Sequence, residues 1–252
     1  MPLALLPGQV FAPLLVFVRL GTMLMLLPGF GEVYVPQRYR LLLGLLLALM
    51  VAPVLAPALP KLPADPAALT ALLFAEIVIG AFLGSIARFL LFALDTAGTI
   101  ISMQLGLSAA QVFNPMMAQQ TTLPGAFLMA AGAMVVFATD AHHLMLRAAV
   151  DSYAVFAAGQ LPPWGELSDA IAHGAASSFR LGVELAAPFL VVGTVFFAAI
   201  GVLSKLVPQL HIFFVAMPLQ ILGGLAVLSL TLAAMMGWFL ERFAESATRL
   251  LP

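Results

Sequence analysis

Apolar residues in this chain fall into long stretches, separated by short clusters of Pro, Gly and polar residues. The stretches are Val10–Leu27, Leu41–Leu59, Leu69–Leu94, Thr96–Gln111, Leu123–Thr139, Leu144–Ala158, Leu181–Leu203 and Ile212–Leu240. They are rich in Leu, Ala and Met, which favour helices, whereas strands that cross a membrane are shorter and alternate apolar with polar residues. The pattern therefore predicts an all-α fold of membrane-associated helical hairpins.

The middle of the chain, from Thr96 to Thr139, contains no formally charged residue although its centre is polar. The polar residues there are Gln104, Ser108, Gln111, Asn114, Gln119, Gln120, Thr121 and Thr122, with Pro115 among them. These residues interrupt the roughly 20 apolar residues that a spanning helix needs, so a single transmembrane helix is excluded. A connection in open water would normally collect charged residues, whereas a buried one avoids them because desolvated charge is costly. We therefore expect a buried or pore-lining segment that carries function.

Composition sets the class of protein. The 252 residues are 63% hydrophobic and 8% charged, whereas soluble domains are about 25% charged, so an integral membrane or membrane-assembly protein is predicted. The formal net charge of −1, with dispersed basic residues, provides no basic patch for nucleic acid, which is not an expected partner. The absence of cysteine excludes disulfides, thiolate metal sites and a catalytic thiol.

Five ionisable residues lie within or beside apolar stretches: Arg19, Glu76, Arg88, Glu184 and Lys205. A lone charge in hydrocarbon costs at least ~2.5–3.5 kcal/mol, so each of these residues must pair, face water or face protein. A proton or ion relay is one interpretation. Interhelical or intersubunit pairing is the interpretation we favour. Pro208 and Gln209, in the break before the last apolar stretch, are grouped with these structural polar positions.

Three other segments bear on how the chain is organised. Gly80 and Gly84 are one helical turn apart, which permits close helix packing. Leu161–Arg180 is the most polar connection and is expected to be water-exposed and partly helical. The first apolar stretch contains Arg19 and lacks a preceding basic region, so it is expected to be retained rather than cleaved as a signal peptide.

The run Asp140-Ala141-His142-His143 is the one candidate metal site in the sequence. Adjacent histidines on a helix point about 100° apart, and no H-x-x-x-H or E-x-x-H pattern accompanies them. Asp140 is better explained as a helix N-cap, with the histidines in the first turn. No metal or cofactor is therefore expected. The chain also lacks G-x-S-x-G and Walker A motifs, so it is not expected to be an enzyme or to hydrolyse ATP.

Phe113, Met116 and Met117 lie among the uncharged amides of the central polar region. Methionine is flexible and polarizable, so it can fill an irregular gap and repack when the gap changes shape. That property suits a deformable plug. Simple packing at the tip of a helical hairpin explains the same residues equally well, and both interpretations stay open on these grounds.

The segment that runs from Gln104–Ser108 through Phe113–Pro115 resembles the corresponding stretch of the FliR family of bacterial flagellar export-gate proteins. The resemblance extends along essentially the whole chain, through Arg19–Gly21, Pro28–Gly31, Val35-Pro36, Glu76, Gly80, Gly84, Asp140–Leu144, Asp151–Tyr153, Lys205–Phe214 and Met217-Pro218. His211 departs from it, because an amide residue is expected there. The Asp140–His143 and Asp151–Tyr153 runs look more like the flagellar branch than the type III virulence branch.

The resemblance implies an assembly and a place in the cell. FliR-like chains complete a helical ring of FliP-like and FliQ-like subunits beside FlhB-like and other export-apparatus membrane proteins, in the bacterial inner membrane at the flagellar basal body. Residues 1–160 are expected to be a FliP-like helical part that includes the central plug hairpin, and residues 161–252 a FliQ-like hairpin. The transported substrates would be unfolded flagellar axial proteins.

In the family, a loop from this subunit plugs the channel, and by position it matches Gly106–Thr122. The plug residues assigned here are Gln104, Gly106, Gln111, Phe113, Asn114, Pro115, Met116, Met117, Gln119 and Gln120. In this hypothesis the side chains of Phe113, Met116 and Met117 obstruct the lumen of the channel. The amide side chains hydrogen-bond to neighbours, and Gly106 and Pro115 fix the bends of the loop.

Three alternatives are kept. The first is a subunit of a virulence type III export apparatus. The second is a small-solute transporter or ion channel that uses Glu76, Arg88 and Asp95 as ligands. The third is an intramembrane hydrolase that uses His142 and His143. The last two leave the charge-free central region unexplained.

Overall fold

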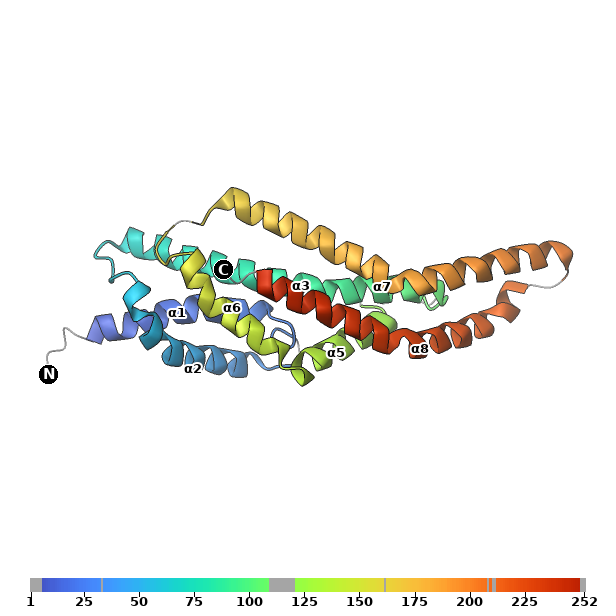
Figure 1. Ribbon diagram of the computed structural model, residues 1–252, viewed down its shortest axis with the longest axis horizontal. Helices are drawn as coiled ribbons and strands as arrows, with labels where there is room; N and C mark the ends of the chain where they lie inside the picture. Colours follow the sequence, from blue (N-terminus) through green and yellow to red (C-terminus); the bar gives the residue numbers. More distant parts are fainter. Residues whose placement is uncertain are drawn as a thin grey trace. The chain divides into compact units, whose positions relative to one another are not determined.

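The structure is a computed structural model that describes residues 6–32, 34–108, 121–160, 162–207, 209 and 212–249, with backbone only at 6–9, 213, 214 and 247–249. Within these residues every regular element is a helix (Figure 1). The α-helices are α1 (Leu6–Leu26), α2 (Gln37–Leu55), α3 (Pro66–Gln104), α5 (Leu123–Ala138), α6 (Ala141–Val155), α7 (Trp164–Leu206) and α8 (Ile212–Arg249), and a short 3-10 helix, η2 (Ala56–Ala58), follows α2. The predicted all-α fold is confirmed.

Helix boundaries follow the apolar pattern, with the larger differences at α3, α7 and α8. Helix α8 continues past the predicted Leu240 to Arg249. The third and fourth apolar stretches join into one helix, α3, of 39 residues, because a single Asp95 interrupts neither the helical hydrogen bonds nor the apolar face. The polar segment Leu161–Arg180, expected to be partly helical, is helical from Trp164 onward as the first part of α7. Between Asp95 and Asp140, α3 ends at Gln104 and α5 begins at Leu123. The exclusion of a single spanning helix there is confirmed.

The helices build two compact units. Unit 1 contains Met1–Phe89, Val136–Ala175 and Arg242–Pro252, and unit 2 contains Leu90–Val135 and Ala176–Glu241. Helices α3, α5, α7 and α8 contribute residues to both units. These units do not correspond to the predicted FliP-like part (residues 1–160) and FliQ-like part (residues 161–252). That division concerns likeness to partner subunits, and it stays a prediction.

In unit 1, α1 packs against α3 through the small residues that the sequence singled out. A Cβ atom on Gly80 would overlap the carbonyl oxygen of Arg19, and one on Gly84 would lie 2.9 Å from the carbonyl oxygen of Met23. The two backbones are therefore close enough that larger side chains would force the helices apart. The predicted packing role of this glycine pair is confirmed.

In unit 2, α3 is the helix on which the others pack. Gly98 of α3 faces Gly125 of α5 so closely that a Cβ atom on Gly98 would overlap the Gly125 backbone. Further along α5, Gly132 packs against Leu94 and Phe239, both fully buried. These contacts fix the second half of α3 inside unit 2.

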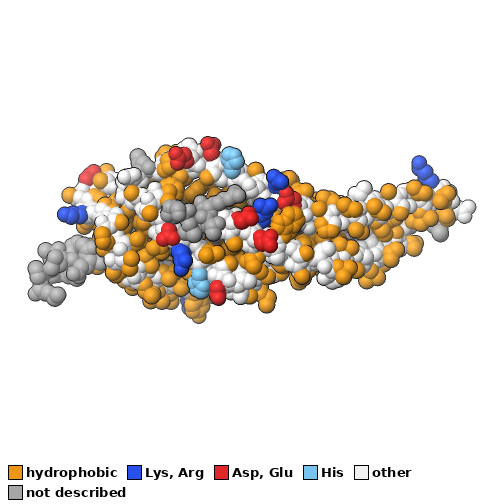
Figure 2. Space-filling view, in the orientation of Figure 1, with side chains coloured by type: hydrophobic (Ala, Val, Ile, Leu, Met, Phe, Trp, Pro, Cys, Tyr) orange, Lys and Arg blue, Asp and Glu red, His pale blue; other side chains and the backbone are white. Residues whose placement is uncertain are grey.

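Four helices among the described residues are long and apolar enough to cross a membrane: Gln37–Ala58, Pro66–Gln104, Trp164–Leu206 and Val215–Ser246. A fifth span results if α5 and α6, bent by 75° at their junction, count as one. Hydrophobic side chains are spread across the whole of the visible face, and acidic and basic groups on it are few (Figure 2). Length, composition and surface together describe a membrane protein.

Candidate functional site: the root of the central segment

The central segment, Gly106–Thr122, begins at a well-defined helix end. The Leu107 amide donates to the Ser102 carbonyl at 3.0 Å, and the Gly106 amide donates to the Met103 carbonyl at 3.2 Å. Gly106 itself has φ 74°. These two bonds and the left-handed glycine make a Schellman motif, in which glycine is favoured because it has no Cβ to clash. The bend predicted at Gly106 is present, and its part in a plug stays a prediction.

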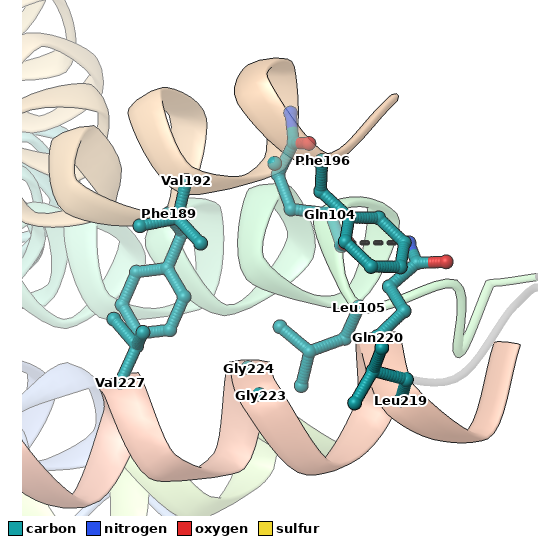
Figure 3. A pocket seen from close by; sticks show the side chains of 11 residues that line it. Gln104, Leu105, Phe189, Val192, Phe196, Leu219, Gln220, Gly223, Gly224 and Val227 are labelled. Carbon is teal, nitrogen blue, oxygen red and sulfur yellow. Dashed lines mark hydrogen bonds between the residues drawn. The ribbon is translucent and has the colours of Figure 1, made fainter. Parts of the chain in front are cut away.

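A Schellman motif leaves the last helical carbonyl without a partner along its own helix, and here α8 supplies one. The side-chain Nε2 of Gln220 donates to the Gln104 carbonyl oxygen at 2.6 Å (Figure 3). Gln220 is only 7% exposed. The bond therefore satisfies both a buried side-chain amide and one of the carbonyls that every helix end leaves unpaired.

Two further contacts bring the α7–α8 hairpin to the same helix end. Leu105, which is buried, packs against Gly224 of α8, and the Gln104 side chain lies against Gly193 of α7. Beside them is a cavity of about 50 Å³, lined mainly by apolar groups of α7 and α8 such as Phe189 (Figure 3). The space is large enough to let these side chains shift.

The segment returns to α3 close to where it left. Thr122 caps α5: its Oγ1 accepts the Gly125 amide at 3.2 Å, which satisfies one of the free donors in the first turn. The contact of Gly125 with Gly98 places the start of α5 about 9 Å before Gln104 along α3, at about 1.5 Å per residue. Both ends of the central segment are thus held on one helix.

Asp95 lies beside this return point. Its Oδ1 is buried and has no hydrogen-bond partner among the described residues, and a Cβ atom on Gly125 would come within 2.8 Å of it. The residues that form the root are otherwise uncharged.

We define the root as residues 101–108 and 121–126 together with Gln220. Of the predicted plug residues, Gln104 and Gly106 belong to it. Gln111, Phe113, Asn114, Pro115, Met116, Met117, Gln119 and Gln120 lie outside the described residues, as do Pro208 and His211. Gln220 was not predicted. The available signal was a lone amide within the apolar run of α8, two residues after Pro218.

A second polar cluster, in unit 1, contains two of the predicted ionisable residues. Arg19 of α1 forms a two-pronged ion pair with Glu76 of α3: Nε donates to Oε2 at 2.6 Å and an Nη donates to Oε1 at 3.0 Å. Arg19 also donates to Ser152 Oγ at 3.2 Å and to the Phe156 carbonyl at 3.0 Å. Its guanidinium lies 3.7 Å from the centre of the Tyr153 ring.

Both charged side chains are fully buried, with 0% exposure. The favoured interpretation, that these charges pair between helices, is confirmed for Arg19 and Glu76. Every donor that Arg19 uses joins α1 to α3 or to α6 and the residue after it, so the cluster fastens three parts of unit 1 together. While Glu76 has both oxygens on Arg19, it is not free to act as a substrate or proton ligand.

The other predicted polar positions are more exposed. Glu184 accepts from Arg180 at 2.7 Å on the same face of α7, a surface pair that contributes little to stability. Lys205 is exposed in the last turn of α7, where a cation suits the helix dipole, and Gln209 is exposed in the following turn. Arg88 is half-buried on α3.

The Asp140–His143 run corrects one step of the sequence argument. Asp140 precedes α6 as predicted, but with φ 57° and no side-chain capping bond. The ligand atoms of Asp140, His142 and His143 all lie within 4.8 Å of one another, so the expectation that the two imidazoles diverge was wrong. Both histidines lie in the first turn of α6, as predicted, and their ring centres are 4.1 Å apart. Asp140 and His143 have largely exposed side chains, and the expectation of no metal stays a prediction.

Comparison with known proteins places the chain in a family. It is 39% identical over 237 residues to the flagellar biosynthetic protein FliR of Caulobacter vibrioides, covering 94% of each chain. It is 32% identical over 213 residues to the FliR of Bacillus subtilis, covering 82% of this chain and 81% of that one. It is also 28% identical over 165 residues to Yop proteins translocation protein T of Yersinia pestis, covering 64% and 62%.

The sequence profile of one family spans nearly the whole chain, both compact units and both ends of the central segment included. Residues 10–246 match the profile of the bacterial export proteins, family 1, and the chain therefore belongs to that family.

Proposed function

We propose that this chain is a subunit of the flagellar type III protein export gate, which forms and plugs the channel through which unfolded flagellar axial proteins leave the cell. The proposal places it in the bacterial inner membrane at the flagellar basal body. It rests on the family, on relatives named flagellar biosynthetic protein FliR, and on the geometry of the root.

The observation that carries the plug hypothesis is the combination of fixed ends and missing charge. One end of the central segment continues directly from α3, whose last carbonyl is hydrogen-bonded to Gln220 of α8, and the other end is held on α3 by the Gly98–Gly125 contact. The segment between them contains no ionisable residue. A conduit for unfolded chains needs a lining that does not trap charged substrates and a seal that can yield. A tethered, neutral, methionine-containing loop meets both needs.

The proposed partners are FliP-like and FliQ-like gate subunits, with FlhB-like proteins nearby. Large apolar side chains are exposed on α2, α7 and α8, for example Val54, Val195 and Leu230. In the cell these faces would be covered by lipid or by neighbouring helices. The chain itself is proposed to have no enzymatic activity and no cofactor, so the energy for export would come from other components.

The relative named Yop proteins translocation protein T supports a second candidate, a subunit of a virulence type III apparatus. The flagellar assignment is preferred because the flagellar relatives align over more of the chain, up to 94% against 64%. A small-solute transporter is less favoured, because Glu76 is already engaged by Arg19.

Deleting Val112–Gln120 tests the plug. The assembled gate should then conduct small ions when no substrate is being exported, because the obstructing side chains are gone while the root at either end is retained. Ion leakage across the membrane is measured in cells, with co-purification of the partner subunits as the control for assembly. Unchanged conductance together with normal export would show that the central segment is not the plug.

A further inference from the structure

We propose that Gln220 is a positioning residue of the gate: its side-chain amide, carried on α8, fixes the end of α3 and thereby the point at which the central segment begins. This inference rests on the function proposed above. It assigns a role to a residue that lies 116 positions away from its partner in the sequence.

The first step of the argument is the mutual need of the two bonded groups. A buried amide without a partner is unfavourable, and so is a helix-end carbonyl that is shielded from water. Gln220 is 7% exposed and its Nε2 lies 2.6 Å from the Gln104 carbonyl oxygen. If the Gln220 amide is removed or moved away, the Gln104 carbonyl loses its hydrogen-bond donor, and the amide likewise has no acceptor if the end of α3 moves. The bond thus selects one position of the α3 end relative to α8.

The second step is that the bond does not act alone. Leu105 packs on Gly224, about one turn further along α8, and the Gln104 side chain lies against Gly193 of α7. Both helices of the α7–α8 hairpin therefore touch the last residues of α3 (Figure 3). None of these contacts involves a charge. A change in the position of the hairpin would move the root directly.

The third step is the space beside the contact. The partly open cavity of about 50 Å³ is bordered by Gln104, Leu105 and Gln220, so side chains at this junction have space to move into. The α3–α5 side of the root has no such slack, because Gly98 and Gly125 meet backbone to backbone. Movement at the root is therefore expected on the side that Gln220 controls.

Gln220→Leu tests the inference, because leucine has a similar size but donates no hydrogen bond. We expect ion leakage through the assembled gate to rise by about tenfold, the population shift that corresponds to losing one hydrogen bond at a buried group. Gly223→Ala is the matched control: it lies on the same helix and cavity, and its added Cβ would meet nothing within 4 Å. Its leakage should equal that of the wild type.

A deletion background separates positioning from general destabilisation. If Gln220 acts through the central segment, Gln220→Leu should add no leakage to the gate that already lacks Val112–Gln120. An equal increase in both backgrounds would overturn the inference. Leakage from the deletion with none from Gln220→Leu would also overturn it, while leaving the proposed function intact. A deletion that does not leak would contradict the proposed function itself.

A covalent replacement gives an independent test. The chain contains no cysteine, and Leu105 and Gly224 are in direct contact, so Leu105→Cys with Gly224→Cys should form a disulfide between α3 and α8. In the Gln220→Leu background, the disulfide should lower ion leakage to the wild-type level under oxidising conditions. Leakage should rise again when the disulfide is reduced. Persistent leakage with the link formed would refute the positioning role. Gln220→Met serves in the same design if Gln220→Leu fails to accumulate.

Discussion

The Arg19–Glu76 cluster of unit 1 and the root of unit 2 solve the same problem with different chemistry. Each holds polar groups away from water inside an apolar membrane protein, and each includes a backbone carbonyl among its acceptors. The cluster uses a fully buried ion pair. The hydrogen bonds of the root join neutral groups, and the buried Oδ1 of Asp95 lies beside them.

Because one site is charged and the other neutral, disrupting the two sites costs different amounts of free energy. Removing one partner of a buried ion pair costs about 3–5 kcal/mol, whereas a neutral hydrogen bond contributes about 1 kcal/mol. The cluster therefore fastens α1, α3 and the end of α6 in one arrangement. On the side of Gln220, the root is held by contacts weak enough to rearrange. A stable scaffold and an adjustable loop attachment are what a gate subunit needs from the same chain.

The largest expected effect comes from breaking the cluster. Arg19→Ala or Glu76→Ala should lower the free energy of unfolding by about 3–5 kcal/mol, because each leaves a buried charge without its partner. Denaturant unfolding of the purified protein in detergent, followed by circular dichroism, measures the change. Arg180→Ala, which breaks an ion pair whose arginine side chain is 81% exposed, should change stability by at most about 1 kcal/mol.

The double variant Arg19→Met with Glu76→Leu sharpens the same test. Removing both charges together should be less harmful than removing either alone, since no unpaired charge remains. Single variants as stable as the wild type would mean that the cluster does not fasten unit 1, and the contrast between the two regions would disappear.

A smaller effect is expected at the tight side of the root. Gly98→Ala should destabilise the protein by about 1–3 kcal/mol, because the new Cβ would overlap the Gly125 backbone, which cannot move without separating α3 from α5. Gly237→Ala is the control, since its Cβ would meet nothing within 4 Å and alanine favours the helix. The same detergent unfolding assay applies. Equal stabilities for the two variants would show that α3 and α5 are not in close contact.

Much of this contrast was visible in the sequence. Apolar stretches predicted the helices, and the charge-free interval predicted a break between α3 and α5. Gly106 was assigned as a bend within the plug hypothesis, and glycine suits the left-handed conformation that the structure shows at this helix end. The need of Arg19 and Glu76 for partners also followed from the cost of burying charge.

The partners themselves could not be predicted. Arg19 and Glu76 are 57 residues apart and Gln104 and Gln220 are 116 apart, so only the packing of helices brings each pair together. The two His residues were correctly assigned to the first turn of a helix, but helix geometry alone did not predict that their ring centres would lie 4.1 Å apart. Asp95 was treated as a break between two stretches, but α3 continues through it.

The smallest effect should come from the cap at the return point. Thr122→Ala should remove the bond from the Gly125 amide and destabilise the first turn of α5 by about 1 kcal/mol, while Thr122→Ser should retain it. Hydrogen exchange at Gly125 and Ala126, read by mass spectrometry, detects this local opening. Thr121→Ala is the neighbouring control, because no capping bond to its hydroxyl is observed.

The cap variant distinguishes a locally adjustable root from one that is coupled to the whole fold. Faster exchange confined to the start of α5, with unit 1 unchanged, would agree with contacts that can open singly. Faster exchange around Arg19 and Glu76 as well would mean that the two regions unfold as one cooperative body. In that case the root could not rearrange while the scaffold stays fixed, and a gate would need its freedom of movement elsewhere.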